Sequence, residues 1–115
     1  MKEQRMNAAL LEAFPELKDE FNEYTSWQDG LDTGAFLTYE DIFLPRIVEA
    51  LNNNEIDFLK RTADFIEKEL TQEDEYAANV IYVGVLEGLK AKCEEQKVRT
   101  FLHGTALKDF DSLTY

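Results

Sequence analysis

Apolar side chains recur every three or four residues along most of this chain, which is the period of an amphipathic α-helix. No segment of the sequence alternates apolar and polar residues at the period of a strand, so we predict no β-sheet. The most apolar run is residues 76–89, Tyr-Ala-Ala-Asn-Val-Ile-Tyr-Val-Gly-Val-Leu-Glu-Gly-Leu. Helices that are hydrophobic on all sides are usually buried. We therefore expect a central helix over about 73–92, in which Gly84 and Gly88 allow a neighbouring helix to approach closely.

The same period predicts further helices on both sides of the central one. They are expected at residues 2–14, 15–24, 38–52, 55–70 and 94–103, with residues 105–115 folding back as a turn or short helix. Pro15 should open the second helix, because proline suits the first helical turn. Pro45 should kink its helix or mark the true start of that helix. Residues 25–37, which include Gly30 and Gly34, are expected to form the longest loop.

Several residues resemble helix termini. In three segments a capping side chain is followed three residues later by a carboxylate, the pattern of a helix N-terminus. These segments begin at Thr38, Asn54 and Thr71, and we expect each of the three side chains to cap a helix. Gly104 is expected to end the helix over 94–103, with His103 in the last turn, because glycine commonly follows a helix C-terminus.

These elements predict an all-α protein with a single domain over residues 1–115. Five to six antiparallel helices with short corners would form either a HEAT-like stack of helical hairpins or an orthogonal bundle. The chain has 115 residues, of which 44% are hydrophobic, which suffices for a core without disulfide bonds. It has one cysteine, which suits a reducing compartment. No run approaches the roughly 20 apolar residues of a membrane span, and the N-terminus lacks a signal-peptide core. We expect a cytoplasmic protein.

Charge narrows the possible partners. The formal net charge is −12, from 24 acidic and 12 basic residues, and acids outnumber bases in 1–37, in 38–71 and in 72–115. The folded body itself is therefore expected to be acidic. Such a surface disfavours nucleic acid and anionic membranes, and it favours a basic protein partner. Solubility alone would also explain an acidic composition.

The sequence contains no convincing chemical motif. One histidine, His103, and one cysteine, Cys93, cannot form a zinc site, and Cys93 is expected to be partly buried and structural. Residues 29–34 lack the oxygen spacing of a calcium loop. Acid pairs such as Asp64 and Glu67 are expected on solvated helix faces. We therefore predict no catalytic residue, no cofactor and no bound metal.

Aromatic and acidic residues gather around the expected loop and the start of the next helix. Aromatic side chains are common anchors at interfaces, and carboxylates would face a basic partner. The predicted partner-binding residues are Trp27, Asp29, Asp32, Tyr39, Glu40 and Asp41. The alternative is that Trp27 and Tyr39 only pack the loop onto the core.

Three segments resemble a family of small, acidic, all-helical and uncharacterised bacterial proteins: Leu-Leu-Glu-Ala-Phe-Pro-Glu-Leu at 10–17, Asp-Phe-Ile-Glu at 64–67, and the run at 80–89. The resemblance spans most of the chain and rests mainly on packing motifs. It implies immunity proteins of contact-dependent growth inhibition or other polymorphic toxin systems, which neutralise a basic toxin, usually a nuclease, by blocking its active site or an essential surface.

On this basis we expect a cytoplasmic, antitoxin-like immunity protein that is not an enzyme and is a monomer or weak dimer when free. Two alternatives stay open. One is an acidic nucleic-acid mimic or adaptor that binds a basic host protein. The other is a small hydrolase that uses carboxylates, for which a carboxyl group with a raised pKa in a concave pocket would be required.

Overall fold

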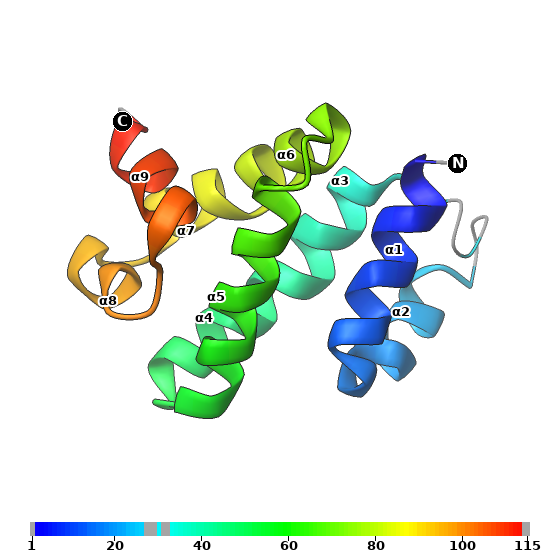
Figure 1. Ribbon diagram of the computed structural model, residues 1–115. Coiled ribbons are helices and arrows are strands. Elements are labelled where there is room, and N and C mark those ends of the chain that lie inside the picture. Colours follow the sequence, from blue (N-terminus) through cyan, green and yellow to red (C-terminus); the bar gives the residue numbers. More distant parts are fainter. Residues whose placement is uncertain (1, 27–29, 31–32, 114–115) are drawn as a thin grey trace.

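The protein is all-helical in the part that the computed structural model describes, residues 2–26, 30 and 33–113 (Figure 1). This confirms the predicted fold class. The elements are α1 (Lys2–Ala13), η1 (Pro15–Leu17), α2 (Lys18–Tyr24), α3 (Ala35–Thr38), η3 (Tyr39–Phe43), α4 (Leu44–Asn52), α5 (Ile56–Leu70), α6 (Glu75–Ile81), η4 (Tyr82–Leu86), α7 (Glu87–Lys92), α8 (Glu95–Arg99) and α9 (Gly104–Ser112). Here η1 is a 3₁₀ turn, whereas η3 and η4 are π-helical turns.

Two of the helical rods are built from three elements each. The π-turn η3 joins α3 to α4, and η4 joins α6 to α7, so the backbone stays helical over 35–52 and over 75–92. Pro45 is the second residue of α4, which follows η3 directly, so it lies where the π-turn changes to α-helix inside the rod. The helix begins at Ala35, three residues before the predicted Thr38, and the predicted loop over 25–37 is correspondingly shorter.

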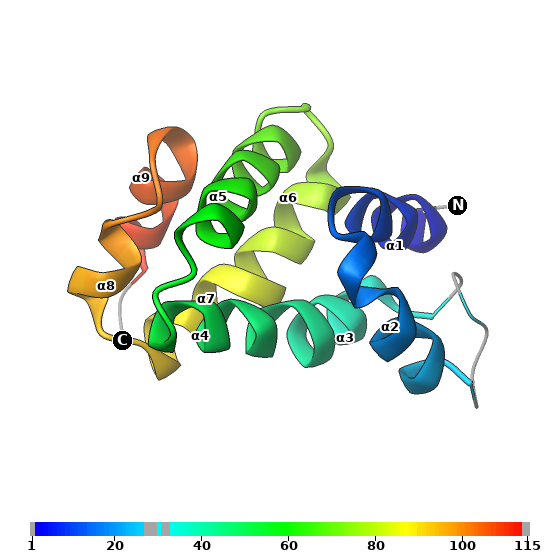
Figure 2. The ribbon, with the colours of Figure 1, turned by 90° about the horizontal axis from the view of Figure 1, so that it is seen from below.

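The central helix packs as its glycines predict. A Cβ atom added at Gly84 would lie 3.3 Å from the Cβ of Tyr39, and one added at Gly88 would lie 2.2 Å from the Cδ2 of Leu44. The α6–α7 rod therefore lies directly against the α3–α4 rod, and the two π-turns meet at the contact. The rods cross instead of stacking as equal hairpins, which matches the bundle alternative (Figure 2).

Aromatic side chains fill the centre, where the start of the chain meets the α3–α4 rod and α5. Neighbouring ring centroids there lie 5.0 to 6.3 Å apart, a range typical of favourable aromatic pairs. The five rings are those of Phe14, Tyr39, Phe43, Phe58 and Phe65.

Buried polar groups fasten α1 to the α3–α4 rod. The Asn7 side chain is fully buried and donates from Nδ2 to the backbone oxygen of Thr33 at 2.8 Å, while its Oδ1 accepts from Thr38 Oγ1 at 2.5 Å. The hydroxyl of Tyr39 donates to the backbone oxygen of Met6 at 2.6 Å. These bonds satisfy polar groups that would be costly to bury alone.

The structure corrects all three predicted N-caps. Thr38 lies inside the helical rod and is buried, so it caps nothing. Asn54 has φ 56° and turns the corner after α4, where the N–H of Glu55 donates to the oxygen of Ala50 as in a Schellman C-cap. Asn tolerates this left-handed conformation better than most residues, which explains its place there.

The third cap is displaced by three residues. Thr71 closes α5 instead, and its Oγ1 donates to the backbone oxygen of Glu67 at 2.8 Å. Asp74 caps α6, because its Oδ1 accepts from the N–H groups of Tyr76 and Ala77 at 3.0 and 3.2 Å. The carboxylate of a capping pattern can itself be the cap, which the sequence pattern does not distinguish.

The C-terminal region differs most from the prediction. The helix expected over 94–103 is the short α8, and Gly104 begins α9 instead of ending a helix. Gly104 has φ 56°, and an added Cβ would lie 2.7 Å from Oε1 of Glu67. His103 is an exposed residue before α9, with Nε2 3.4 Å from Oδ1 of Asp64, and not part of a last turn. The described chain thus forms seven continuous helical stretches, one more than the upper prediction.

Glu67 on α5 holds the N-terminus of α9. Its Oε1 accepts from the N–H of Thr105 at 2.8 Å, and its Oε2 accepts from the N–H of Ala106 at 3.0 Å. A carboxylate from another helix therefore supplies the cap that His103 does not.

Candidate functional site

Three of the six predicted partner-binding residues, Trp27, Asp29 and Asp32, lie outside the described residues. The other three do not share one environment. Tyr39 is fully buried, so its assignment to an exposed surface was wrong and the packing alternative is correct for it. Glu40 and Asp41 follow it on η3 and are exposed, because successive helical residues point in different directions.

An acidic surface is formed where α2 meets η3. We name it the α2–η3 surface and define it by Glu20, Tyr24, Glu40 and Asp41. The hydroxyl of Tyr24 donates to Oδ2 of Asp41 at 2.5 Å and so joins the two elements. Glu20 lies one helical turn before Tyr24, on the same side of α2. Within the described residues, none of the three carboxylates forms an ion pair.

The carboxylates of this surface raise the pKa of its tyrosine. The hydrogen bond to the Asp41 carboxylate, with smaller effects from burial and from the charges of Asp41 and Glu40, raises the pKa of Tyr24 to about 12. Deprotonation would place a phenolate beside carboxylates, and the bond holds the proton in place. A cation would be stabilised at the same position.

Elsewhere carboxylates are neutralised by arginine. Arg46 forms two bonds to Glu55, at 3.2 and 2.7 Å, and Arg61 forms two to Glu16. Hydrogen bonds from these guanidinium groups lower the pKa of Glu55 and of Glu16. Both guanidinium groups also lie over the ring of Phe58, at 4.2 and 5.4 Å from its centroid. This network links the first helices to α4 and α5, so its role is structural.

The remaining candidates for chemistry have ordinary environments. Cys93 is half-buried, and burial raises the pKa of its thiol, which opposes nucleophilic reactivity. Burial raises the pKa of Glu67, but the hydrogen bonds from Ala106 and Thr105 outweigh this effect and leave the pKa below its usual value. In the described part of the chain, no three His, Cys, Asp or Glu side chains are grouped to hold a metal ion. Nor is any described helix long and apolar enough to cross a membrane.

Two features of the candidate site were not predicted from the sequence. Tyr24 connects α2 to Asp41 through its hydroxyl, and it is not among the predicted partner-binding residues. The concave surface between α1 and α5, described below, depends on how two distant helices lie. For Tyr24, the carboxylate of Glu20 four residues earlier was a weak signal in the sequence. For the concave surface between α1 and α5 the sequence contains no local signal.

Comparison with known proteins places the chain in a family. Residues 7–112 match a family described as Domain of unknown function (DUF7674). No curated protein matches the chain, and no solved structure does. Because the match covers nearly all of the sequence, this protein belongs to the DUF7674 family.

Proposed function

We propose that this protein is a binding protein of the immunity type, which neutralises a basic toxin domain by covering its active site or substrate surface. The observation that carries the proposal is the α2–η3 surface, whose exposed carboxylates have no cationic partner in the described part of the chain. Unpaired surface carboxylates attract a basic protein and accelerate its association. They can also occupy the places that substrate phosphates take on a nuclease.

The carboxylates with perturbed pKa values support a binding role. Those of Glu16, Glu55, Glu67 and Asp74 all lie below their usual values. A general acid needs the opposite shift. Cytoplasmic location, and a monomer or weak dimer before binding, are part of the same proposal.

The test is a rescue assay in which the chain is co-expressed with the toxin domain encoded beside its gene. Cells should survive only when the chain is present, and the two proteins should purify as a complex. The variant Glu20→Lys/Glu40→Lys should lose rescue, because it replaces two carboxylates of the surface with cations. The control Glu73→Lys/Glu94→Lys makes the same change of net charge at exposed sites elsewhere and should retain rescue. Equal effects of the two variants would refute the proposed contact surface, and a harmless neighbour would refute the function.

A further inference from the structure

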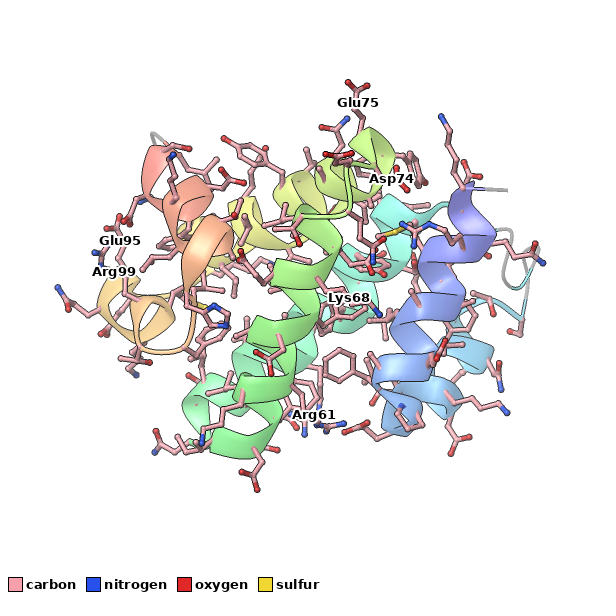
Figure 3. All side chains as sticks on the ribbon, viewed as in Figure 1. Arg61, Lys68, Asp74, Glu75, Glu95 and Arg99 are labelled. Atoms are coloured by element: carbon pink, nitrogen blue, oxygen red, sulfur yellow. The ribbon has the colours of Figure 1, made fainter. Side chains whose placement is uncertain are left out.

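A groove lies between α1 and α5, on the side of the molecule where these helices face each other across a gap (Figure 3). It consists of two adjoining hollows of about 230 and 280 Å³ that share Ala13, Phe65 and Lys68. Each hollow by itself is smaller than the roughly 300–1,000 Å³ of small-molecule sites. They suit the side chains of a protein partner better than a cofactor.

Ion pairs close the groove at both ends. At one end Arg5 on α1 bonds to the buried Glu69 on α5 at 3.2 Å, and at the other Arg61 on α5 bonds to Glu16. Arg61 and Glu69 are eight residues apart, which corresponds to about 12 Å along a helix. The open part therefore accommodates roughly two turns of a helix.

The floor of this opening is apolar, and small apolar side chains of α1 lie beside it. Phe65 forms the floor, and behind it the aromatic core begins. Ala9 and Ala13 are four residues apart on α1 and present only methyl groups, so a third helix could approach closely. An amphipathic helix laid into such a groove places side chains at positions i, i+4 and i+7 against the floor.

The charges at the rim indicate the chemistry of the occupant. Glu12 on α1 and Asp64 on α5 lie on opposite walls and are exposed. Lys68 projects from α5 toward α1 and forms no ion pair with any described residue (Figure 3). Its long apolar stem can lie along the groove while the amine moves into solvent. Arg5 and Arg61 are already paired, so the rim offers the carboxylates of Glu12 and Asp64, the latter 3.4 Å from Nε2 of His103, and the single cation of Lys68.

We propose that this groove receives a short, basic, amphipathic helix of the partner protein. Its apolar side chains would pack on Phe65, Ala9 and Ala13, and its cations would face Glu12 and Asp64. This inference rests on the proposed function, and it specifies that the partner binds through a helix.

The probe is a synthetic helical peptide with leucine at i, i+4 and i+7 and lysine at its other positions. Titration followed by amide NMR should move the signals of Ala9, Ala13, Phe65 and Lys68. The variant Ala13→Phe fills the groove and should weaken binding about tenfold or more, the effect of losing one buried anchor. The control Ala8→Phe adds the same ring on the exposed side of α1 and should bind as the unmodified protein does.

Charge variants test the same groove without added bulk. Lys68→Glu should strengthen peptide binding and Glu12→Lys should weaken it, whereas a peptide with serine in place of leucine should lose the interaction. Equal binding by the Ala13→Phe and Ala8→Phe variants, equal binding of the serine peptide, or no binding would overturn the proposal. So would a dimer of the free protein that Ala13→Phe dissociates, since a second copy would then occupy the groove. The rescue assay measures toxin neutralisation and can fail independently of the peptide titration.

Discussion

The carboxylate of Glu67 should stabilise the C-terminal helix from a distance of almost forty residues in sequence. It accepts two backbone N–H groups at the start of α9, at 2.8 and 3.0 Å. Glu67→Gln keeps one acceptor oxygen and replaces the other with an NH₂ group, which would face the second N–H. The expected loss of unfolding free energy is about 1–2 kcal/mol, the range for an N-cap and for a hydrogen bond to a charged group. For a chain of this size this corresponds to a decrease in Tm of roughly 4–8 °C.

The effect should depend on pH in a defined direction. The folded-state pKa of Glu67 lies below its ordinary value, so the unfolded chain binds the proton more readily. The contribution to stability is therefore complete above the unfolded pKa of about 4.3 and is lost as the pH falls through the folded value. The difference between the unmodified protein and Glu67→Gln should be large at pH 7 and should shrink below about pH 4.

Urea denaturation followed by far-UV circular dichroism measures this difference, and amide exchange of Thr105 and Ala106 locates it. Both amides should exchange faster in Glu67→Gln, while amides of the central helix change little. Glu12→Gln, an exposed substitution on α1, should alter stability by less than about 0.5 kcal/mol. An unchanged stability at pH 7, or a difference that persists undiminished at acid pH, would refute the assignment of Glu67 as the cap.

Three further outcomes follow from the same geometry. Gly84→Leu places a side chain of four carbon atoms against the α3–α4 rod and should destabilise by about 1–3 kcal/mol. Val83→Leu at the neighbouring exposed position should be nearly neutral by urea denaturation. Ultraviolet titration should show Tyr24 ionising at about pH 12, within a high-pH range to which Tyr39 and Tyr76, whose pKa values burial raises, also contribute. Asp41→Asn should shift the Tyr24 part of the titration to lower pH, and an unaltered titration would contradict the hydrogen bond. Gly104→Ala should cost at least about 1 kcal/mol, because the left-handed backbone disfavours a side chain and the new Cβ would meet a carboxylate.

The helices themselves could be predicted from the sequence because their determinants are local. Apolar residues at helical spacing fix which face of each segment is buried, and the expected central helix over 73–92 is observed as Glu75–Lys92. The use of Gly84 and Gly88 could also be predicted. Glycine in a helix interior costs about 1 kcal/mol relative to alanine, so two of them on one face indicate a close neighbour.

Helix termini were predicted less well, because the same side chain can serve either end of a helix. Thr38, Asn54 and Thr71 match a capping pattern, yet the first is internal to a rod and the other two lie at C-termini. Gly104 suits a helix end by local preference, but here its missing side chain makes room for Glu67. A position that needs glycine is recognisable from sequence, whereas the reason for the need lies in another helix.

Some properties of the candidate surface also follow from the sequence, and others follow only from the tertiary structure. Acidity, the absence of a chemical motif and the exposure of Glu40 and Asp41 follow from the sequence, since composition and helical period determine them. The burial of Tyr39, the bond from Tyr24 to Asp41 and the α1–α5 groove are decided only by tertiary structure. Each depends on the relative placement of helices that are distant along the chain. That placement is determined by the packing of the whole core, which local periodicity does not encode.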